Sequence, residues 1–208
     1  MILWPVVERG KVRQAEMLER IVRFVLDDVG NTFSANTLAQ YFKSQRRRVD
    51  PETVYSYLRL LEEAYLIGRA PRFDLRGKEI LKTQEKYYAV DHSLIHAVLG
   101  FSTSRIQGML ENIVWAELRR RGYEVMIGKV GANEIDFVAR QGTDSLYVQV
   151  AYLLGADPAT LERERTPLLA AAGKHPSYLV SLDPLAAGSQ DGIRHLGLGE
   201  FLLSDSLG

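Results

Sequence analysis

Residues 134–140 read Glu-Ile-Asp-Phe-Val-Ala-Arg, and residues 146–152 read Leu-Tyr-Val-Gln-Val-Ala-Tyr. Both runs are rich in β-branched and aromatic residues, and the stretch Gln141-Gly142-Thr143-Asp144 between them is typical of a turn. The sequence therefore predicts two neighbouring strands here. Each strand carries polar side chains among apolar ones, which makes the pair a candidate site.

The faces of these strands follow from the side-chain period of two. One face of the first strand is predicted to carry Glu134, Asp136 and Val138. In the second strand, Gln149 and Ala151 point away from the apolar face. These positions are the ones to match against known sites.

The rest of the second half predicts alternating helices and strands. A helix from Arg105 to Arg121 is ended by Gly122, and Glu111 lies on its apolar side beside Trp115. A carboxylate on such a side is expected to be partly buried and to need a partner. The remaining elements are a strand from Tyr123 to Lys129, a helix from Pro158 to Ala172, a strand from Tyr178 to Leu182 and a closing element from Ile193 to Leu203.

The first half predicts three helices and a hairpin. Apolar residues recur at helical spacing up to Leu26, and Gly30-Asn31 ends that helix. Ser34 is a favourable N-cap for a second helix to Phe42, and Asp50-Pro51 opens a third helix through Glu63. Two strands follow, Leu66–Phe73 and Glu79–Val90, with a turn at residues 74–77. Three short helices followed by a hairpin are typical of a winged helix-turn-helix.

A duplex-binding surface follows from this winged-helix prediction. The third helix would enter the major groove with its outward side chains, and the preceding turn and the hairpin tip would contact phosphates. The predicted DNA-binding residues are Arg46, Arg47, Arg48, Thr53, Tyr55, Ser56, Arg59, Arg76 and Lys78. Residues 40–90 carry 11 Lys and Arg against 7 Asp and Glu, which agrees with phosphate contact but also with an ordinary solvated surface.

Composition excludes several classes of protein. The chain of 208 residues has 46% hydrophobic and 25% charged residues and no cysteine, so disulfide scaffolds and thiolate metal sites are excluded. No run approaches the roughly 18 apolar residues of a membrane span, and the N-terminus lacks a secretory signal pattern. We expect no membrane association and a cytoplasmic location.

The order of acidic positions resembles the restriction-endonuclease-like fold, the PD-(D/E)XK family. In that family a helix Glu, a strand Asp and a strand Glu/Gln-x-Lys meet, carboxylates hold a divalent metal, and the lysine readies the attacking water. The resemblance implies Glu111, Asp136 and Gln149 as the site residues, with Glu111 and Asp136 as metal ligands and Ala151 in place of the lysine. It implies Mg²⁺ as a cofactor only if such a site is active.

A narrower resemblance covers nearly the whole chain. It rests on residues 81–88 (Leu-Lys-Thr-Gln-Glu-Lys-Tyr-Tyr), on Glu111-Asn112-Ile113-Val114 and on the two strand motifs together. These are similar to the C-terminal region of a prokaryotic AAA-type ATPase family, in which an ATPase half precedes a winged helix and a degenerate nuclease-like domain. The P-loop pattern Gly-x-x-x-x-Gly-Lys-Ser/Thr is absent, so we expect no ATP binding or hydrolysis by this chain. The chain would be a truncated product, a fragment or a form that stands alone.

The resulting prediction is an α+β/α/β protein with a winged helix in residues 1–97 and a restriction-endonuclease-like αβββαβ domain in residues 101–208. Its predicted function is a non-catalytic DNA- or partner-binding module. The alternatives are a divalent-metal-dependent nuclease with a lysine-free site and a purely protein-interaction domain, with another protein or a second copy as partner.

Overall fold

The computed structural model describes residues 6, 8, 10, 14–155, 158–171, 173, 175–183 and 187–207, except the side chains of residues 82, 83, 158 and 187. Its helices are α2 (Ala15–Asp27), α3 (Ala35–Ser44), α4 (Pro51–Glu63), α5 (Ser93–Leu99), the 3₁₀ turn η1 (Thr103–Arg105), α6 (Ile106–Arg120), α7 (Pro158–Ala170) and α8 (Leu198–Leu203). Its strands are β1 (Ile67–Asp74), β2 (Glu79–Ala89), β3 (Glu124–Val130), β4 (Asn133–Gln141), β5 (Asp144–Ala151), β6 (Ser177–Ser181), β7 (Ala187–Gln190) and β8 (Ile193–Gly197).

Helices α3 and α4 form as their sequences predict. The hydroxyl of Ser34 accepts a hydrogen bond from the backbone N–H of Thr37 at 3.1 Å and so caps α3, and Pro51 stands at the first turn of α4. Both helices bury the predicted apolar faces, which are Leu38, Ala39 and Phe42 in α3 and Val54, Tyr57, Leu58 and Leu61 in α4. Local capping and periodicity therefore suffice to place this pair.

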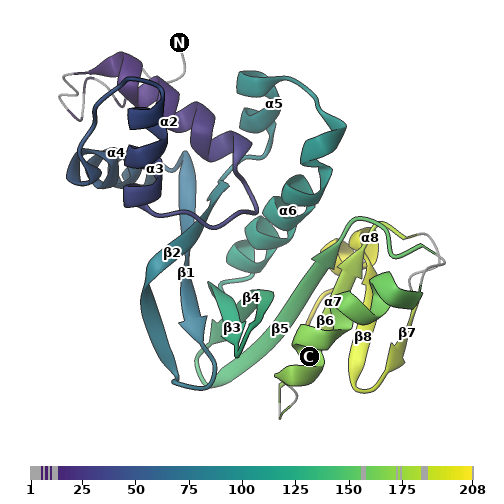
Figure 1. The fold of residues 1–208 in the computed structure, drawn as a ribbon. Helices are drawn as coiled ribbons and strands as arrows, with labels where there is room; N and C mark the ends of the chain where they lie inside the picture. The colour runs from purple at the N-terminus through teal and green to yellow at the C-terminus, as the bar shows by residue number, and fades with distance from the viewer. Residues whose placement is uncertain are drawn as a thin grey trace.

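All eight strands of the described residues belong to one mixed sheet, in the order β2-β1-β3-β4-β5-β6-β8-β7. Strand β1 pairs with β2 in antiparallel fashion and with β3 in parallel fashion. The hairpin that was predicted as a wing of the first half thus continues the sheet of the second half, as Figure 1 shows. The fold is mixed α/β.

The two faces of the sheet have different covers. Helices α6 and α8 pack on one face, where Phe137, Val150 and Phe201 belong to the larger apolar core. Helix α7 packs on the other face, where Ala151 and Leu168 belong to a second apolar cluster. The larger core also contains the buried faces of α2, α3 and α4, so it extends across the predicted boundary between the halves.

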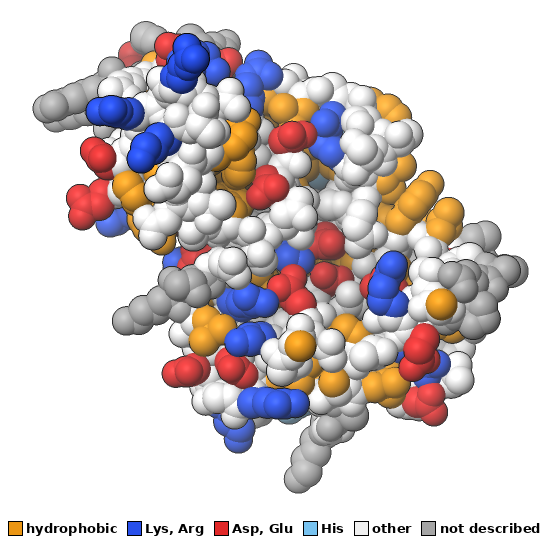
Figure 2. All heavy atoms as spheres, viewed as in Figure 1, with side chains coloured by type: hydrophobic (Ala, Val, Ile, Leu, Met, Phe, Trp, Pro, Cys, Tyr) orange, Lys and Arg blue, Asp and Glu red, His pale blue; other side chains and the backbone are white. Residues whose placement is uncertain are grey.

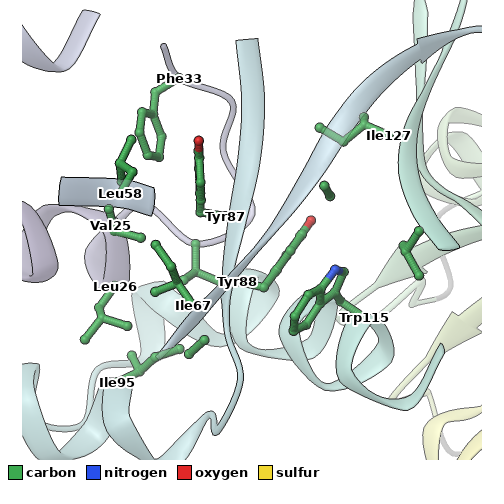
Figure 3. Packing of buried hydrophobic residues seen from close by; sticks show 14 of the residues in the cluster. Val25, Leu26, Phe33, Leu58, Ile67, Tyr87, Tyr88, Ile95, Trp115 and Ile127 are labelled. Atoms are coloured by element: carbon green, nitrogen blue, oxygen red, sulfur yellow. The ribbon is translucent and has the colours of Figure 1, made fainter. Parts of the chain in front are cut away.

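Two adjacent tyrosines of β2 join the two parts of the larger core. Because side chains alternate along a strand, Tyr87 and Tyr88 point to opposite sides of β2 (Figure 3). The ring of Tyr87 stacks on Phe33, with 5.1 Å between centroids. The ring of Tyr88 stacks on Trp115 of α6, with 5.5 Å between centroids. One short stretch of strand is therefore packed against both the helix cluster and the sheet-covering helix.

Several elements differ from the sequence prediction. Helix α5 was not predicted, residues 193–203 form the strand β8 followed by the helix α8, and β7 is an additional strand. A bulge in β4 sets Asp136 and Phe137 together opposite Ile127 of β3. Beyond the bulge the alternation is reversed, so Val138 lies on the α7 face with Ile135, and the predicted sharing of one face by Asp136 and Val138 is wrong.

Candidate functional site

Asp136 lies where β4 and β5 cease to pair. The last paired residues are Phe137 and Val148. Beyond them, the Asp136 carboxylate replaces a backbone carbonyl of β4 as the hydrogen-bond acceptor for β5. Its Oδ2 accepts a hydrogen bond from the backbone N–H of Val150 at 2.9 Å. The backbone N–H of Asp136 in turn donates to Oε1 of Gln149 at 3.3 Å. The sheet thus fixes the position of this carboxylate between two strands.

The counter-charge of Asp136 is a lysine from a distant strand. Lys86 of β2 is only 3% exposed, and its ammonium nitrogen lies 3.3 Å from Oδ1 of Asp136. The same nitrogen lies 3.2 Å from Oε2 of Glu111 and 3.2 Å from Oε1 of Glu134. Figure 2 shows acidic and basic side chains gathered in the hollow between the upper left and lower right parts of the molecule. We call Lys86, Glu111, Glu134 and Asp136 the lysine–carboxylate cluster.

Neighbouring groups satisfy the remaining oxygen atoms of Glu111. Its Oε2 also accepts a hydrogen bond from the Tyr88 hydroxyl at 3.2 Å, and its Oε1 accepts one from Nε2 of Gln107 at 3.2 Å. The backbone after α2 closes one side, because a Cβ added to Gly30 would lie 3.2 Å from Oε2 of Glu111. Each oxygen of Glu111 and Asp136 therefore already accepts at least one hydrogen bond.

A buried asparagine positions Lys86 relative to α6. The side chain of Asn112 accepts a hydrogen bond from the backbone N–H of Ala89 at 2.7 Å and donates one to the Ala89 carbonyl at 2.8 Å. This pair of hydrogen bonds fastens the end of β2 to the helix that carries Glu111. Lys86 itself stands opposite Ala70, immediately after an irregularity in the pairing of β1 with β2.

The electrostatics follow from burial and the shared cation. Burial raises the pKa of Glu111 to about 7, with a further rise from Asp136 and an opposing effect from Lys86. Burial also raises the pKa of Asp136, which Lys86 partly offsets. Burial alone would lower the pKa of Lys86, but Asp136, Glu111 and Glu134 together outweigh it and raise that pKa. The lysine therefore stays protonated, which prevents it from acting as a base.

Gln149 and Ala151 share one face of β5, as the strand alternation predicted, and α7 covers this face. Nε2 of Gln149 donates to Oε2 of Glu164 in α7 at 3.1 Å, so this helix adds a further carboxylate beside the site. Ala151 is buried in the apolar cluster with Leu154 and Leu168. Position 151, to which the sequence resemblance assigned the place of a nuclease lysine, is thus part of the core.

The predicted residues Glu111, Asp136 and Gln149 are brought together, but they do not fit a divalent metal. A metal would have to share oxygen atoms with the ammonium of Lys86, about 3.2–3.3 Å away from them, and two adjacent cations repel each other. Within the described part of the chain, no group of three His, Cys, Asp or Glu residues has the arrangement of a metal site. The donor set is therefore matched to the lysine ammonium rather than to magnesium.

The predicted DNA-binding residues divide into two places. Arg46 and Arg48 are exposed in the turn before α4 and form no ion pair with another described residue, whereas Arg47 turns back to Glu16 of α2 at 3.1 Å. Along α4, Tyr55 is 48% exposed, and Arg59 pairs with Glu63 at 2.8 Å. Thr53 is half-buried and Ser56 is exposed, with its hydroxyl bonded to the Glu52 carbonyl.

The hairpin tip lies away from this helix. Arg76 and Lys78 are exposed in the turn between β1 and β2, and the Arg76 guanidinium packs near Gly131 of the turn between β3 and β4. Strand β1 runs from the end of α4 to this tip, so the length of the strand separates the two predicted contact regions (Figure 1). The predicted contacts of helix and hairpin tip are therefore not contiguous.

The sequence prediction missed Lys86, Tyr88, Gln107 and Glu164 as members of the site. The sequence carries no clear signal for Lys86, since it directly follows the polar residues Thr83-Gln84-Glu85 and stands at the edge of the run Tyr87-Tyr88-Ala89. The partners of Lys86 could not be predicted from the sequence, because Glu111 and Asp136 lie 25 and 50 positions away along the chain.

Comparison with known proteins gives a partial match to one family. Residues 6–105 match a family described as a domain of unknown function, DUF8612. An uncharacterised protein of Haemophilus influenzae is 38% identical over 152 residues, which cover 73% of this chain and 38% of that protein. An uncharacterised protein of Methanocaldococcus jannaschii is 29% identical over 153 residues, which cover 72% of this chain and 34% of that protein.

The chain matches little more than a third of the length of these two relatives. No solved structure matches it significantly. Among the described residues, the structure contains no helix with the length and apolar character needed to cross a bilayer.

Proposed function

We propose that this chain is a non-catalytic nucleic-acid-binding module, built from a winged helix and a restriction-endonuclease-like domain whose site is closed by an internal lysine. The observation that carries the proposal is the contact of the Lys86 ammonium with Glu111, Glu134 and Asp136. A cation fixed in this position replaces the metal that a nuclease of that fold would need between its carboxylates.

The winged-helix part is supported by more than the order of its elements. Helices α3 and α4 are joined by a short turn, and Phe33 before α3 forms an isolated antiparallel bridge with Glu85 of β2. This bridge from the segment before the helix pair to the hairpin supports the winged-helix proposal. The exposed Arg46 and Arg48 beside α4 supply cations for phosphate oxygens.

The nuclease-like part is supported by the arrangement around Asp136. An acidic helix residue, an acidic strand residue and Gln149 of the next strand meet where β4 and β5 separate. We further propose that the chain corresponds to the C-terminal region of an AAA-type ATPase family. The matches to only 38% and 34% of two longer relatives agree with this, because they leave room for an additional half.

The test combines binding and cleavage in one preparation. We expect the wild type to bind a fluorescent 25-base-pair duplex, measured by anisotropy, with an affinity that decreases as the salt concentration rises. The double variant Arg46→Gln with Arg48→Gln should flatten the slope of log affinity against log salt by roughly 1.8. The matched control is Arg119→Gln with Arg163→Gln, which removes two exposed arginines from the second half. Absence of binding by the wild type would favour a protein-interaction domain instead.

A metal-dependent nuclease is the second candidate, and one observation favours it. Lys86 provides the cationic group that Ala151 cannot provide, but it reaches the site from β2 and not from β5. In this case linear or plasmid DNA would be cut in magnesium or manganese, and Asp136→Asn would abolish the cutting. We expect intact DNA from both proteins. Cleavage that disappears with Asp136→Asn would refute the non-catalytic proposal and leave the duplex-binding result unaffected.

A further inference from the structure

A second cationic region lies on the opposite side of α2 from the buried core. Four arginines line a groove of about 440 Å³ between α2, α3 and the connection from α5 to α6. They are Arg20, Arg23, Arg47 and Arg105. Figure 1 shows α2 between the α3–α4 pair and α5, which is the position from which it forms one wall. Among the lining residues the only acidic side chain is Asp27, so the described lining carries a net positive charge.

The walls of the groove also contain aromatic side chains. Tyr41 of α3 is 46% exposed, and its ring contacts Phe24 of α2 with 5.1 Å between centroids. One side of the Tyr41 ring is thus supported by Phe24, and the exposed part is available for another flat ring. A supported aromatic ring beside guanidinium groups is the combination that binds bases and phosphates of single strands.

The four arginines share three exposed carboxylates, which are those of Glu16, Glu19 and Asp27. Oε1 of Glu16 lies 2.9 Å from Arg20 and 3.1 Å from Arg47, so a single exposed carboxylate serves both. The guanidinium of Arg105 contacts Asp27 and the carbonyls of Leu99 and Gly100, while its Nε has no hydrogen-bond partner among the described residues. Arg23 donates to the carbonyl of Val98, and its guanidinium lies 3.6 Å from Oε1 of Glu19.

An anionic ligand can exchange with Glu16. The side chain of Glu16 is 69% exposed, and exposed ion pairs contribute little to stability because water screens them. A phosphate placed between Arg20 and Arg47 would replace one carboxylate by a group with more acceptor oxygens. The rearrangement needs only the rotation of one surface side chain.

We infer that this groove binds a single-stranded segment of nucleic acid, with a phosphate between Arg20 and Arg47 and a base on Tyr41. The inference rests on the proposed nucleic-acid-binding function and extends it to a surface separate from the exposed face of α4. It also gives Arg47 a role different from its neighbours, because Arg47 turns into the groove whereas Arg46 and Arg48 remain exposed beside α4.

The test measures binding of a fluorescent 15-nucleotide oligo(dT) by the full chain. The variant Arg20→Gln with Arg47→Gln should flatten the slope of log affinity against log salt by roughly 0.7, the single-strand value for the one phosphate that the two arginines share. Tyr41→Ala should weaken binding about tenfold. Glu16→Gln should strengthen binding about two- to fivefold, because it frees both arginines. Circular dichroism confirms that each variant is folded, and Arg119→Gln with Arg163→Gln is the matched charge control.

The outcomes separate the possible explanations. Wild-type affinity in the Arg20 and Arg47 variant, or no gain in Glu16→Gln, overturns the inference. Loss in the arginine variant without loss in Tyr41→Ala, together with competition by inorganic phosphate, shows a simple phosphate site and also overturns it. Binding of the 25-base-pair duplex is measured in parallel. If the duplex binds through Arg46 and Arg48 while oligo(dT) does not bind, the groove fails and the proposed function stands.

Discussion

The ammonium nitrogen of Lys86 lies 3.3 Å from Oδ1 of Asp136, although 50 residues separate the two along the chain. Lys86 comes from the hairpin of the first half and Asp136 from the central sheet of the second half. Their contact is buried, and Glu111 and Glu134 also contact the Lys86 ammonium. The charge balance of the site is therefore set jointly by both halves.

Removal of the lysine should leave several buried carboxylates without a cation. We expect Lys86→Met to lower the free energy of unfolding by about 3–5 kcal/mol, the usual effect of breaking a buried ion pair. Urea denaturation measures the change, and Lys43→Met, which changes an exposed lysine of α3, is the control. If the loss arises from uncompensated charge, then adding Glu111→Gln should restore part of it. A loss that is equal in the double variant would point to packing instead.

Glu111 should make the stability depend on pH. Its pKa rises from an ordinary value of 4.5 to about 7 in the folded protein, so between these values the folded state holds a proton that the unfolded chain releases. The contribution of Glu111 to stability is therefore largest below about pH 4.5 and is lost as the pH rises to about 7. The slope is at most about 1.4 kcal/mol per pH unit.

Denaturation of the wild type and of Glu111→Gln at pH 5, 6, 7 and 8 tests this sign. The difference between the two should change across the lower part of this range and level off above pH 7. Glu117→Gln is the comparison, because Arg120 and Arg121 lower the pKa of Glu117, so that its contribution stays constant over this range and is lost only below its ordinary pKa of 4.5. Parallel curves for wild type and Glu111→Gln would contradict the prediction.

Gly108 should tolerate no side chain. A Cβ at this position would lie 2.2 Å from the carbonyl oxygen of Val29, where the backbone after α2 crosses α6. We expect Gly108→Ala to lower the free energy of unfolding by about 1–3 kcal/mol, because the two backbones must move apart. Gly199→Ala in α8 meets nothing within 4 Å and should be neutral or stabilising. Thermal melting should therefore show a clear loss only for Gly108→Ala, and equal losses in the two variants would refute the argument.

Asn112 should be essential for the seating of β2 on α6. Replacement by leucine leaves the backbone N–H and carbonyl of Ala89 without the side-chain partners at 2.7 and 2.8 Å. We expect a loss of about 2–4 kcal/mol, since each buried group left unpaired costs roughly 1–3 kcal/mol. Asn31→Ala, which changes an exposed side chain, is the control for urea denaturation. A loss below about 1 kcal/mol would show that strand pairing alone holds β2.

Prediction from sequence succeeded where the information was local. Ser34 and Pro51 start their helices, and the faces of α3 and α4 are buried as their spacing predicted. Glu111 and Asp136 both contact the Lys86 ammonium, and Gln149 accepts a hydrogen bond from the backbone N–H of Asp136, but the bulge at Asp136 means that strand periodicity alone did not predict this arrangement. The winged helix, the nuclease-like fold and the DNA contacts remain proposals, since only the mixed sheet and its helices are established.

The failures concern long-range pairing. The parallel pairing of β1 with β3 leaves no local pattern in either strand, so the continuous sheet was not foreseen. The bulge at Asp136 depends on the register with Ile127, and it moved Val138 to the other face. Lys86 follows polar residues of the same strand and so carries no local sign of burial, and its partners come from other elements of the fold.

The parallel pairing of Arg72, Phe73 and Asp74 with residues 127–129 has a consequence for any attempt to divide the protein. A cut near residue 100 would leave β3 with unpaired N–H and C=O groups along one side, and would leave β1 with the same on its own side. Such uncovered strand edges pair readily with other chains. Separately expressed halves should therefore self-associate into precipitates, and the two pieces should become well-behaved only when they are produced together.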